Sequence, residues 1–556
     1  NLTPDVRKII DRYRYLDGER IIERGALQLE KNLQDDYVKF FCLSENLNTH
    51  AGLGVLGLVT SHGFLDNIFL RGMRRSLIDT YDKLFVFDLH GNVLRGEVSP
   101  DGSRDKNVFD IKQTGVAISI FSKISRQLEK SITHAELWGD AKLSKLPFLA
   151  SHTLQSVVKS IVNPAKPAWL LSLRDETNLA EYEAGISIAD VMPLRSLGVV
   201  TGRDRFVTDF EEEDLLDRLH SFAESSEIGE ELDQRFGLRS SKWWSAEVAR
   251  KKLQSASDFS DYVRPVLYRL FDSRYCFYHR AVFESLRRPV MRHLDPGHKN
   301  KLLVSTRMVK GESWRHVFVS EGLVEAISLS SKTSNSAHVF PLYRYPDDSQ
   351  ELFQGSKEAN FSPAFISQFS QSIGRPFEAE EAFSYIYSVL HSTIYRLRYS
   401  EFLRSDFPKI LLPINTKLGS ALIKLGDELI SVHLMQVLRK DCISPQLVGR
   451  GAFQVDNVSY SDETVWVNKT MTHGFKGVPE EVWNFQIGGY QVCAKWLKDR
   501  QAKGGNNPSP GRVLTDEDID HYQKIVVALS ETIRIMAEID VVIEAHGGWP
   551  DAFSEN

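Results

Sequence analysis

The residues with the strongest chemical signature are arginines and lysines gathered in one segment. Residues 264–310 hold eleven Lys or Arg and only three Asp or Glu, a net charge of +8. Within the segment, Arg269 and Arg274 are separated by aromatic side chains. Guanidinium groups donate paired hydrogen bonds to phosphate and to guanine, and basic stretches interleaved with aromatics are typical of nucleic-acid-binding surfaces. We therefore expect a surface here that contacts phosphates.

The predicted DNA contacts are the cations of this segment that come before residue 310: Arg264, Arg269, Arg274, Arg280, Arg287, Arg288, Arg292, Lys299, Lys301 and Arg307. For any single arginine an internal role is the alternative. Asp272 can pair with Arg269 or Arg274, and Phe271 and Tyr275 can belong to the core.

Other common catalytic motifs do not support a site. Residues 52–57 match the dinucleotide pattern GxGxxG, but here a helix precedes the glycines and a strand follows, the reverse of what the motif requires. The sequence contains no P-loop, no GxSxG elbow and no HExxH. We predict no metal site. The four cysteines form no CxxC pair, which fits reduced thiols in a cytoplasm.

Length and composition describe an ordinary globular chain. Its 556 residues are 42% hydrophobic and 26% charged, which argues against disorder and predicts two to four domains. No apolar run is long enough to span a bilayer, so we expect no membrane association. The net charge of −6 conceals an acidic block, because residues 209–233 hold eleven acids and one base. We expect this block to form a solvated helix pair.

The first part of the chain reads as α/β. The apolar runs at 55–60, 84–89 and 115–121 are predicted strands, the first two buried on both faces. An arginine-rich helix at 70–78 lies between the first two, so we expect a right-handed crossover and a parallel sheet. Residues 95–110 are predicted to form a loop at a sheet edge.

Later segments mix helices with short strands. Helices are predicted at 35–41, 151–162 and 380–405, and strands at 314–320, 338–345 and 465–467. Residues 504–511 read as a loop. Thr515 and Asp518 form a capping box that opens a long amphipathic helix, whose apolar stripe runs from Ile519 to Ile539.

Several sequence words, taken in order, resemble a known family. The words DDYVKF (35–40), GVLG (54–57), GFLDN (63–67), FLRGMR (69–74), DLHGN (88–92), NVFDI (107–111) and GVAI (115–118) resemble the C-terminal half of an adenine-N6 DNA methyltransferase core. The words YRLFDSR (268–274), YIYSVLHS (385–392), VPEEVW (478–483), IGGYQV (487–492) and KWLKDR (495–500) resemble the target-recognition region of Type ISP restriction–modification enzymes.

The resemblance implies a fold and a function. The fold is α/β: the C-terminal half of a Rossmann-like methyltransferase sheet (1–190), followed by a mixed α+β target-recognition domain (191–556) that ends in a long helix. The implied function is recognition of a specific duplex DNA sequence and methyl transfer from S-adenosylmethionine to adenine N6. Such an enzyme flips its target base out of the duplex. The location expected for such an enzyme is the cytoplasm.

Two departures from the family pattern matter. The adenine-binding motif Asn-Pro-Pro-Tyr and the Gly-rich cofactor motif are not in this sequence, so we expect them, and the cofactor-binding residues, upstream of Asn1. The expected partners are therefore duplex DNA and the nuclease, ATPase and methyltransferase regions of the same polypeptide. As given, the chain is expected to be inactive in methylation on its own. Leu270 also stands where such enzymes usually have proline.

Phe109 is the candidate for a residue that stacks on the flipped adenine from within this chain, and the alternative is a core residue at the entry to a strand. Two other functions remain open for the whole chain. One is a DNA-specificity module with no chemistry of its own. The other is an unrelated α/β enzyme acting on a small molecule, which the +8 segment and the order of the motifs disfavour.

Overall fold

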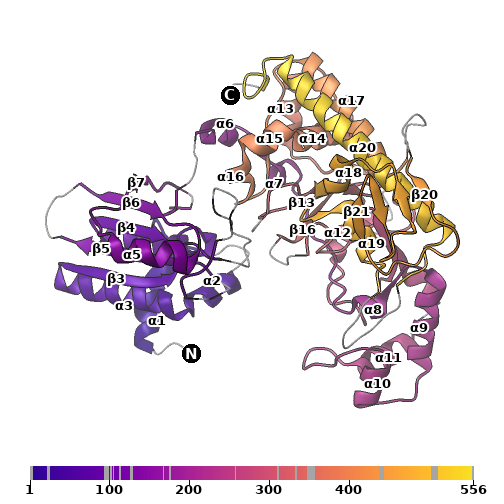
Figure 1. Ribbon diagram of the computed structural model, residues 1–556, viewed down its shortest axis with the longest axis horizontal. Coiled ribbons are helices and arrows are strands. Elements are labelled where there is room, and N and C mark those ends of the chain that lie inside the picture. Colours follow the sequence, from indigo (N-terminus) through magenta and orange to yellow (C-terminus); the bar gives the residue numbers. More distant parts are fainter. Residues whose placement is uncertain are drawn as a thin grey trace. The chain divides into compact units, whose positions relative to one another are not determined.

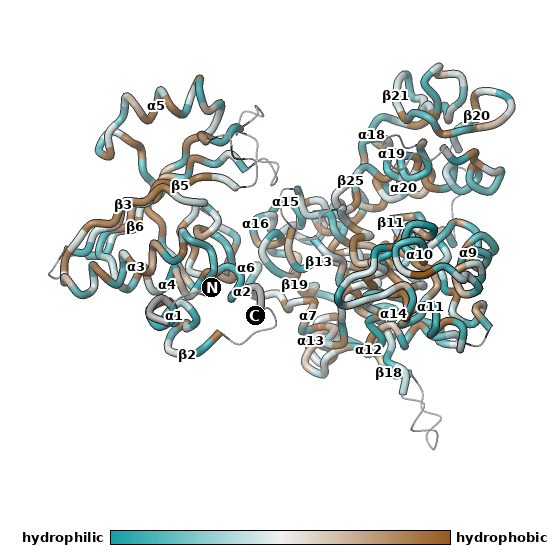
Figure 2. The backbone as a smooth tube through the Cα atoms, turned by 90° about the horizontal axis from the view of Figure 1, so that it is seen from below, coloured by the Kyte–Doolittle hydropathy of each residue, from teal (hydrophilic) through white to brown (hydrophobic). Residues whose placement is uncertain are grey.

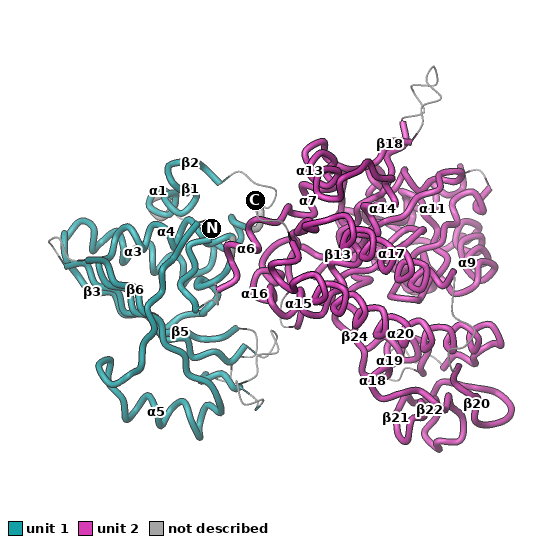
Figure 3. Tube along the Cα trace, turned by 90° about the horizontal axis from the view of Figure 1, so that it is seen from above, with its two compact units in different colours: residues 1–175 teal, residues 176–556 magenta. Residues whose placement is uncertain are grey.

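The structure is a computed structural model, in which the chain forms two compact units (Figure 3). Unit 1 is Asn1–Asp175 and unit 2 is Glu176–Asn556. The boundary between the compact units thus precedes the expected domain boundary at 190/191. The structure describes residues 4–21, 26–92, 99, 103, 105–109, 111, 114–124, 129–166, 168–173, 177–256, 258–309, 312–331, 335–346, 357–436, 444–502 and 511–553.

Unit 1 is built on a five-stranded sheet of order β3-β5-β4-β6-β7 (Figure 1). Its strands are β3 (Gly54–Ser61), β4 (Lys83–Asp88), β5 (Val116–Lys123), β6 (Ser131–Glu136) and β7 (Ser160–Ile161), and a separate hairpin joins β1 (Tyr15–Leu16) to β2 (Glu19–Arg20). Its helices are α1 (Pro4–Ile10), α2 (Ala26–Leu33), α3 (Asp36–Ala51), α4 (Arg71–Thr80) and α5 (Leu146–Ser151), with short turns η1 (Asp11–Arg14), η2 (His62–Phe64), η3 (Ile68–Leu70) and η5 (Ala141–Lys145).

The sheet is mixed, so the prediction of a parallel sheet is wrong in part. β3 and β4 both pair antiparallel with β5, so they run in the same direction, as the crossover through α4 requires, but with β5 between them. β4 and β6 are parallel neighbours. An antiparallel neighbour needs no crossover helix, and the connection from β4 to β5 is the expected loop. Residues 95–98, 100–102, 104 and 110 of that loop lie outside the described residues.

Apolar side chains cover the sheet unequally. One face packs against α3 and α4 through Phe41, Met73 and Leu77. The other face holds a smaller cluster in which Phe87 packs against Phe148 of α5. β4 is buried on both faces as predicted, and Figure 2 shows hydrophobic colouring in the strands of this sheet.

β3 is not buried on both faces, which contradicts the prediction. It is an edge strand in the described sheet, with Val55 71% and Val59 54% exposed. An apolar run alone does not tell an edge strand from a central one, because the difference lies in what pairs with it.

Unit 2 contains two four-stranded sheets near its centre. The first has the order β10-β12-β11-β15, from Thr208–Asp209, Asp272–Phe277, Val263–Arg269 and Leu323–Val324. The second has the order β14-β13-β16-β9, from Val317–Ser320, Leu302–Thr306, Ala337–Pro341 and Ser196–Leu197. A third sheet, β20-β23-β22-β21, is formed by Gln446–Val448, Gly474–Lys476, Thr464–Trp466 and Ser459–Ser461.

Three two-stranded pairs complete the strands of unit 2: β8 (Ile186–Ser187) with β19 (Lys409–Ile410), β17 (Tyr343–Arg344) with β18 (Glu358–Ala359), and β24 (Gln486–Ile487) with β25 (Tyr490–Gln491). The helices are α6 (Leu179–Glu183), α7 (Ile188–Val191), α8 (Asp204–Val207), α9 (Glu212–Glu224), α10 (Gly229–Arg235), α11 (Ala246–Gln254), α12 (Arg288–Met291), α13 (Pro363–Ile373), α14 (Ala379–His391), α15 (Thr393–Arg398), α16 (Ser400–Leu403), α17 (Thr416–His433), α18 (Glu480–Asn484), α19 (Val492–Lys498) and α20 (Asp516–Glu544), with turns η6 (Phe259–Tyr262) and η7 (Arg292–Leu294).

Most helix predictions for unit 2 are confirmed. The acidic block forms α9 and α10, and residues 380–405 form α14 to α16. Thr515 and Asp518 make both bonds of the predicted capping box at the start of α20. The loop at 504–511 lies almost wholly outside the described residues.

One helix prediction is wrong. The segment 151–162 of unit 1 is a turn that leads into β7, because α5 already ends at Ser151. Among the described residues, none of the helices combines the length and hydrophobicity needed to span a membrane.

Candidate nucleic-acid interface

The hairpin of β11 and β12 begins the basic segment and carries the YRLFDSR word. Arg269 pairs with Asp272 in register, so Leu270 and Phe271 form the turn, and Phe271 has a φ of +56°. The amide of Leu270 donates to Tyr490 Oη at 3.1 Å. Proline, the usual residue at position 270 in the resembled family, has no amide hydrogen to make this bond.

Asp272 is a buried carboxylate held between two guanidinium groups. Its Oδ2 accepts from Arg274 at 2.8 Å and 3.1 Å, and its Oδ1 accepts from Arg500 at 2.9 Å. Burial by itself would raise the pKa of Asp272, but Arg500 and Arg274 outweigh it and hold the pKa below its ordinary value. The carboxylate is therefore charged inside the protein.

The ion pairs continue beyond Asp272 to the start of α20. Arg500 lies 3.6 Å from Asp518, and Asp518 accepts from Arg512 at 2.8 Å. Arg512 also pairs with Glu211 at 2.7 Å, next to the start of α9. We call this chain of alternating charges, Arg274–Asp272–Arg500–Asp518–Arg512–Glu211, the ion network. It joins β12, the segment after α19, α20 and the segment before α9.

Arg269 is also internal. Its side chain is 8% exposed, and its guanidinium lies 3.4 Å from Glu325 and stacks on Tyr268 at 4.3 Å. Burial raises the pKa of Glu325 to about 7, although the charge of Arg269 acts in the opposite direction. Arg269 therefore contacts the interior of unit 2.

The YIYSVLHS word of α14 likewise builds the interior. Tyr387 Oη lies 2.5 Å from His433 Nδ1 of α17, and His433 Nε2 lies 2.9 Å from Thr532 Oγ1 of α20. Burial and the charge of Arg396 lower the pKa of His433 to about 3, so its imidazole is neutral. This chain of hydrogen bonds joins three helices that cross one another in Figure 1.

Two of the predicted DNA contacts thus bind carboxylates of the interior, and of these Arg269 is buried and Arg274 is half-buried. Arg269 and Arg274 already have buried carboxylate partners, which is the internal alternative that the sequence left open. Phe271 is buried as that alternative expects, whereas Tyr275 is 38% exposed and is not a core residue. Aromatic residues separate these arginines because the segment is a β-hairpin, and one face of the hairpin packs into the core.

The other eight predicted cations are exposed or half-buried: Arg264, Arg280, Arg287, Arg288, Arg292, Lys299, Lys301 and Arg307. Two of them have surface partners. Arg288 makes a bidentate ion pair with Asp295, with hydrogen bonds of 2.7 Å and 2.8 Å. Arg307 pairs with Asp406 at 2.9 Å. The side chains of Arg280 and Lys299 are exposed to solvent.

Cations and aromatic rings gather around the segment 343–346. Arg292 Nη1 donates to Pro346 O at 3.3 Å, and Tyr345 Oη donates to Lys299 O at 2.7 Å. The ring of His298 stacks on Tyr345 at 3.9 Å, and Lys357 Nζ lies 3.6 Å above the ring of Tyr343. We call the set Arg292, His298, Lys299, Tyr343, Tyr345 and Lys357 the basic–aromatic patch.

Sequence reasoning missed Tyr343, Tyr345 and Lys357. They lie beyond the basic segment. The pairing of β13 with β16 brings Tyr343 and Tyr345 next to Lys299 and Arg292, and the pairing of β17 with β18 adds Lys357. Arg344 is in the same segment, but it lies 3.4 Å from Glu358 and is left out of the patch.

A second missed feature is a pair of tryptophans. Trp244 Nε1 donates to Ala281 O at 2.8 Å, and Arg203 stacks on its ring at 3.5 Å, so Trp244 fixes the connection that carries Arg280. Its neighbour Trp243 is 88% exposed, with Lys242 Nζ 5.2 Å from its ring. The residues Lys242 to Trp244 were a visible signal in the sequence, since paired aromatics beside a cation suit contact with bases or sugars.

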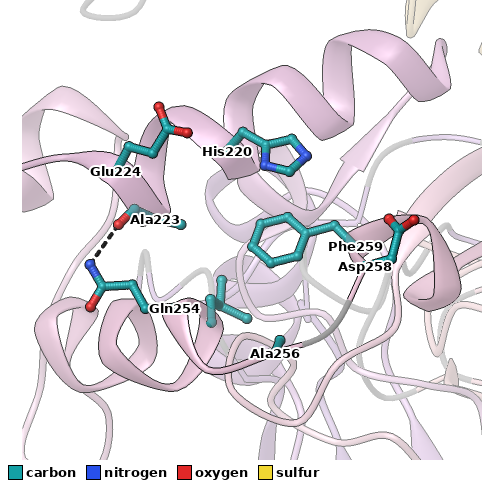
Figure 4. Close-up of a pocket in the computed structure, with 8 residues that line it drawn as sticks. His220, Ala223, Glu224, Gln254, Ala256, Asp258 and Phe259 are labelled. Carbon is teal, nitrogen blue, oxygen red and sulfur yellow. Dashed lines mark hydrogen bonds between the residues drawn. The ribbon is translucent and has the colours of Figure 1, made fainter.

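A pocket lies between α9 and α11 (Figure 4). In it His220 stacks on Phe259 at 4.6 Å, and Gln254 Nε2 donates to Ala223 O at 2.7 Å. The lining residues are His220, Ala223, Glu224, Leu253, Gln254, Ala256, Asp258 and Phe259. None of the predicted DNA contacts is among them, so the pocket does not belong to the candidate interface.

Phe109 of unit 1 is 60% exposed and is therefore not a core residue. Its amide donates to Asn107 Oδ1 at 2.8 Å, and Asn107 Nδ2 donates to Thr114 O at 2.6 Å. These bonds hold a turn just before β5 and leave the ring of Phe109 accessible. Its role as a base-stacking residue stays a prediction.

Comparison with known families identifies the class of protein. Residues 190–538 match the family described as the Type ISP C-terminal specificity domain. This is more than half of the chain, and the chain therefore belongs to that family. The resemblance of the later sequence words to the Type ISP family is confirmed. A search of curated proteins finds no match.

Three solved structures share the fold, and two of them are of Type ISP restriction–modification enzymes. The structure of the ATP-dependent Type ISP restriction–modification enzyme LlaBIII bound to DNA matches with a TM-score of 0.74 at 18% identity, over 97% of this chain and 35% of that one. A nuclease-deletion mutant of LlaGI with a DNA substrate mimic matches at 0.70 and 17% identity, over 96% and 42%. The DrdV–DNA complex matches at 0.71 and 17% identity, over 96% and 54%. The chain thus spans between about a third and about half of the length of these proteins.

We expect Asp272→Asn to destabilise unit 2 strongly. Removing one partner of a buried ion pair leaves unpaired charge in the interior and costs about 3–5 kcal/mol. Because the pKa of Asp272 is lowered in the folded state, its stabilisation is present above the unfolded pKa of about 3.9 and is lost as pH falls through the folded pKa. Urea unfolding between neutral pH and pH 3 should show a loss of stability in acid that is smaller in the variant.

The matched control is Asp295→Asn, which breaks the pair with Arg288 at the surface. The side chains of this pair are 51% and 32% exposed, and surface pairs contribute at most about 1 kcal/mol. Equal losses of stability in the two variants would contradict a structural role for the ion network.

We expect Phe109→Ala to leave the free energy of unfolding within about 0.5 kcal/mol of the parent, as for exposed positions in general. Phe87→Ala is the control, because that ring is 4% exposed and removing a buried phenylalanine costs about 3–5 kcal/mol. Urea unfolding monitored by circular dichroism measures both. A loss for Phe109→Ala as large as for Phe87→Ala would mean that the ring packs in the interior.

Proposed function

We propose that this chain is the DNA-recognition part of a Type ISP restriction–modification enzyme and that it binds a specific duplex DNA sequence through unit 2. The observation that carries the proposal is the basic–aromatic patch together with the exposed cations of the connection between β12 and β13. Family membership supports it, as do three structural matches that are described as complexes with DNA or a DNA mimic.

The polar side chains that hold unit 2 together are different from those that we propose to contact DNA. The ion network and the hydrogen bonds of His433 occupy polar groups of the YRLFDSR, KWLKDR and YIYSVLHS words inside unit 2. These groups can therefore set the shape of the surface without touching DNA. Lysine and arginine side chains at the surface gain affinity by displacing counterions from phosphates. Stacked tyrosine and histidine rings offer flat faces and hydroxyl groups beside them.

We further propose that the complete enzyme transfers a methyl group from S-adenosylmethionine to adenine N6, with Phe109 stacking on the flipped base. The cofactor-binding motif and Asn-Pro-Pro-Tyr would come from a methyltransferase region of the same polypeptide, which would also carry nuclease and ATPase regions. The exposed ring of Phe109, on a turn fixed by Asn107, supports this role. The main alternative is a specificity module without chemistry. It is supported by the family match, which is to a specificity domain only.

Replacing Arg292, Lys299 and Lys357 with alanine should weaken binding to duplex DNA and make it less dependent on salt. Each phosphate contact contributes about −0.9 to the slope of log K against log salt concentration, so the loss of three contacts should reduce the slope by about 2.7. Fluorescence anisotropy with a labelled duplex over a series of salt concentrations measures the slope.

The charge-matched control replaces Lys417, Lys424 and Lys524, which are exposed on α17 and α20, with alanine. This variant loses the same net charge away from the patch and should keep the parental slope. If both triple variants change the slope equally, the effect is one of net charge and the patch is not the interface.

In the complete enzyme, Phe109→Ala should slow methylation of a paired adenine more than that of a mismatched adenine. Stacking on a base is worth about 1–3 kcal/mol, and a mismatched base costs less to extrude. Incorporation of labelled methyl groups from S-adenosylmethionine into matched and mismatched duplexes gives the two rates. A defect of equal size on both substrates would remove Phe109 from the base-binding site, and no incorporation by the parental enzyme would favour the module without chemistry.

A further inference from the structure

Two histidines and an aspartate of unit 1 meet at one end of the sheet. β3 and β4 run in the same direction, so they end at the same edge of the sheet. His62 comes directly after β3, Asp88 is the last residue of β4, and His90 lies two residues beyond Asp88. All three are buried, with exposed fractions of 3%, 6% and 6%. The sequence analysis predicted no metal site, and His62, which lies 26 positions before Asp88 and 28 before His90, forms no metal-binding pattern with them.

Their separations suit a shared cation. His62 Nδ1 lies 3.0 Å from Asp88 Oδ1, and His90 Nδ1 lies 3.7 Å from Asp88 Oδ2. One potential ligand atom from each residue lies within 4.8 Å of those of the other two. Ligands placed about 2.0–2.2 Å from a tetrahedral Zn²⁺ are themselves roughly 3.4 Å apart, so small side-chain movements would bring the three into a coordination shell.

The surroundings fix the rings where a ligand set needs them. A Cβ at position 115 would lie 2.4 Å from His62 Cε1, so only Gly115 leaves room for this imidazole. His90 has a φ of +49°, its amide donates to Asp88 Oδ1 at 2.9 Å, and its ring stacks on Trp138 at 3.4 Å. A strained backbone and a stacked ring hold His90 toward Asp88.

A second carboxylate lies behind His90. Glu136 Oε1 is 3.7 Å from His90 Nε2, on the side of the ring opposite Nδ1. The contact is an ion-pair distance and is longer than a hydrogen bond. A carboxylate on the outer-nitrogen side of a ligating histidine orients the ring, and a small approach of Glu136 would let it accept from Nε2.

We propose that His62, Asp88 and His90 bind a divalent transition-metal cation, with Zn²⁺ as the expected occupant and Glu136 positioning His90. Two imidazole nitrogens and one carboxylate oxygen favour Zn²⁺ and its first-row neighbours over Mg²⁺ or Ca²⁺, which prefer oxygen ligands. The site is independent of the DNA-binding proposal.

A bound cation would also stabilise the turn that carries Phe109. A Cβ at position 91 would lie 2.4 Å from the Cα of Asn107, so the backbone after His90 packs directly on the residue whose side chain holds Phe109. A cation that fixes His90 would therefore limit the movement of both turns. The inferred role is structural positioning.

The test uses the purified full chain and the metals alone. After dialysis against a chelator, the chain should bind about one Zn²⁺, measured by elemental mass spectrometry, and Co²⁺ should give the visible absorption of a site with nitrogen and oxygen ligands. Zn²⁺ should displace Co²⁺, a large excess of Mg²⁺ should not, and the melting temperature should rise with Zn²⁺.

His62→Gln, Asp88→Asn and His90→Gln should each lower Zn²⁺ binding at least tenfold, while the control His152→Gln should leave it unchanged, because His152 is exposed at the end of α5. Circular dichroism checks that each variant is folded. Where a variant does not fold, the Co²⁺ spectrum and the Zn²⁺-dependent melting temperature of the parental chain decide. Absence of both in the parent, or Zn²⁺ binding that all three folded variants retain, would overturn the proposal.

Discussion

Unit 2 is organised around one buried carboxylate. Asp272 is 1% exposed, and taking it out of water would be prohibitive without Arg274 and Arg500, which approach its two oxygens separately. Because Arg500 follows α19 and pairs onward with Asp518 at the start of α20, satisfying this one charge requires that β12 and α20 lie together. A hairpin and a helix that are more than 200 residues apart in sequence are thereby held in one geometry.

The same constraint separates two groups of residues that look alike in the sequence. Arg269 and Arg274 resemble nucleic-acid contacts by type and spacing, yet their guanidinium groups lie against the buried carboxyl groups of Glu325 and Asp272. The cations at the surface come from the connection between β12 and β13 and from residues near β17 and β18. The polar groups that hold unit 2 together are therefore a different set from the cations at its surface.

In unit 1, glycines determine where neighbouring side chains and turns can pack. Gly115 leaves space for the ring of His62, and Gly91 lets the backbone pack on Asn107. Both glycines lie in or beside the connection between β4 and β5, which also carries Phe109. The connection needs no crossover helix because β5 is antiparallel to β4, and its residues are therefore available to build sites at the end of the sheet.

Local patterns in the sequence determined the local structure. The capping box at Thr515 and the apolar stripe behind it predicted α20, and the continuous apolar run at 84–89 predicted a strand buried on both faces, because capping and burial depend on residues close in sequence. The family words likewise identified the specificity domain. Only the tertiary structure decided that β3 is an edge strand, that Arg269 and Arg274 pair with buried carboxyl groups, and that His62 meets Asp88 and His90. Each of these depends on a partner from a distant segment, and neither the spacing nor the type of a residue specifies which distant segment will pack against it.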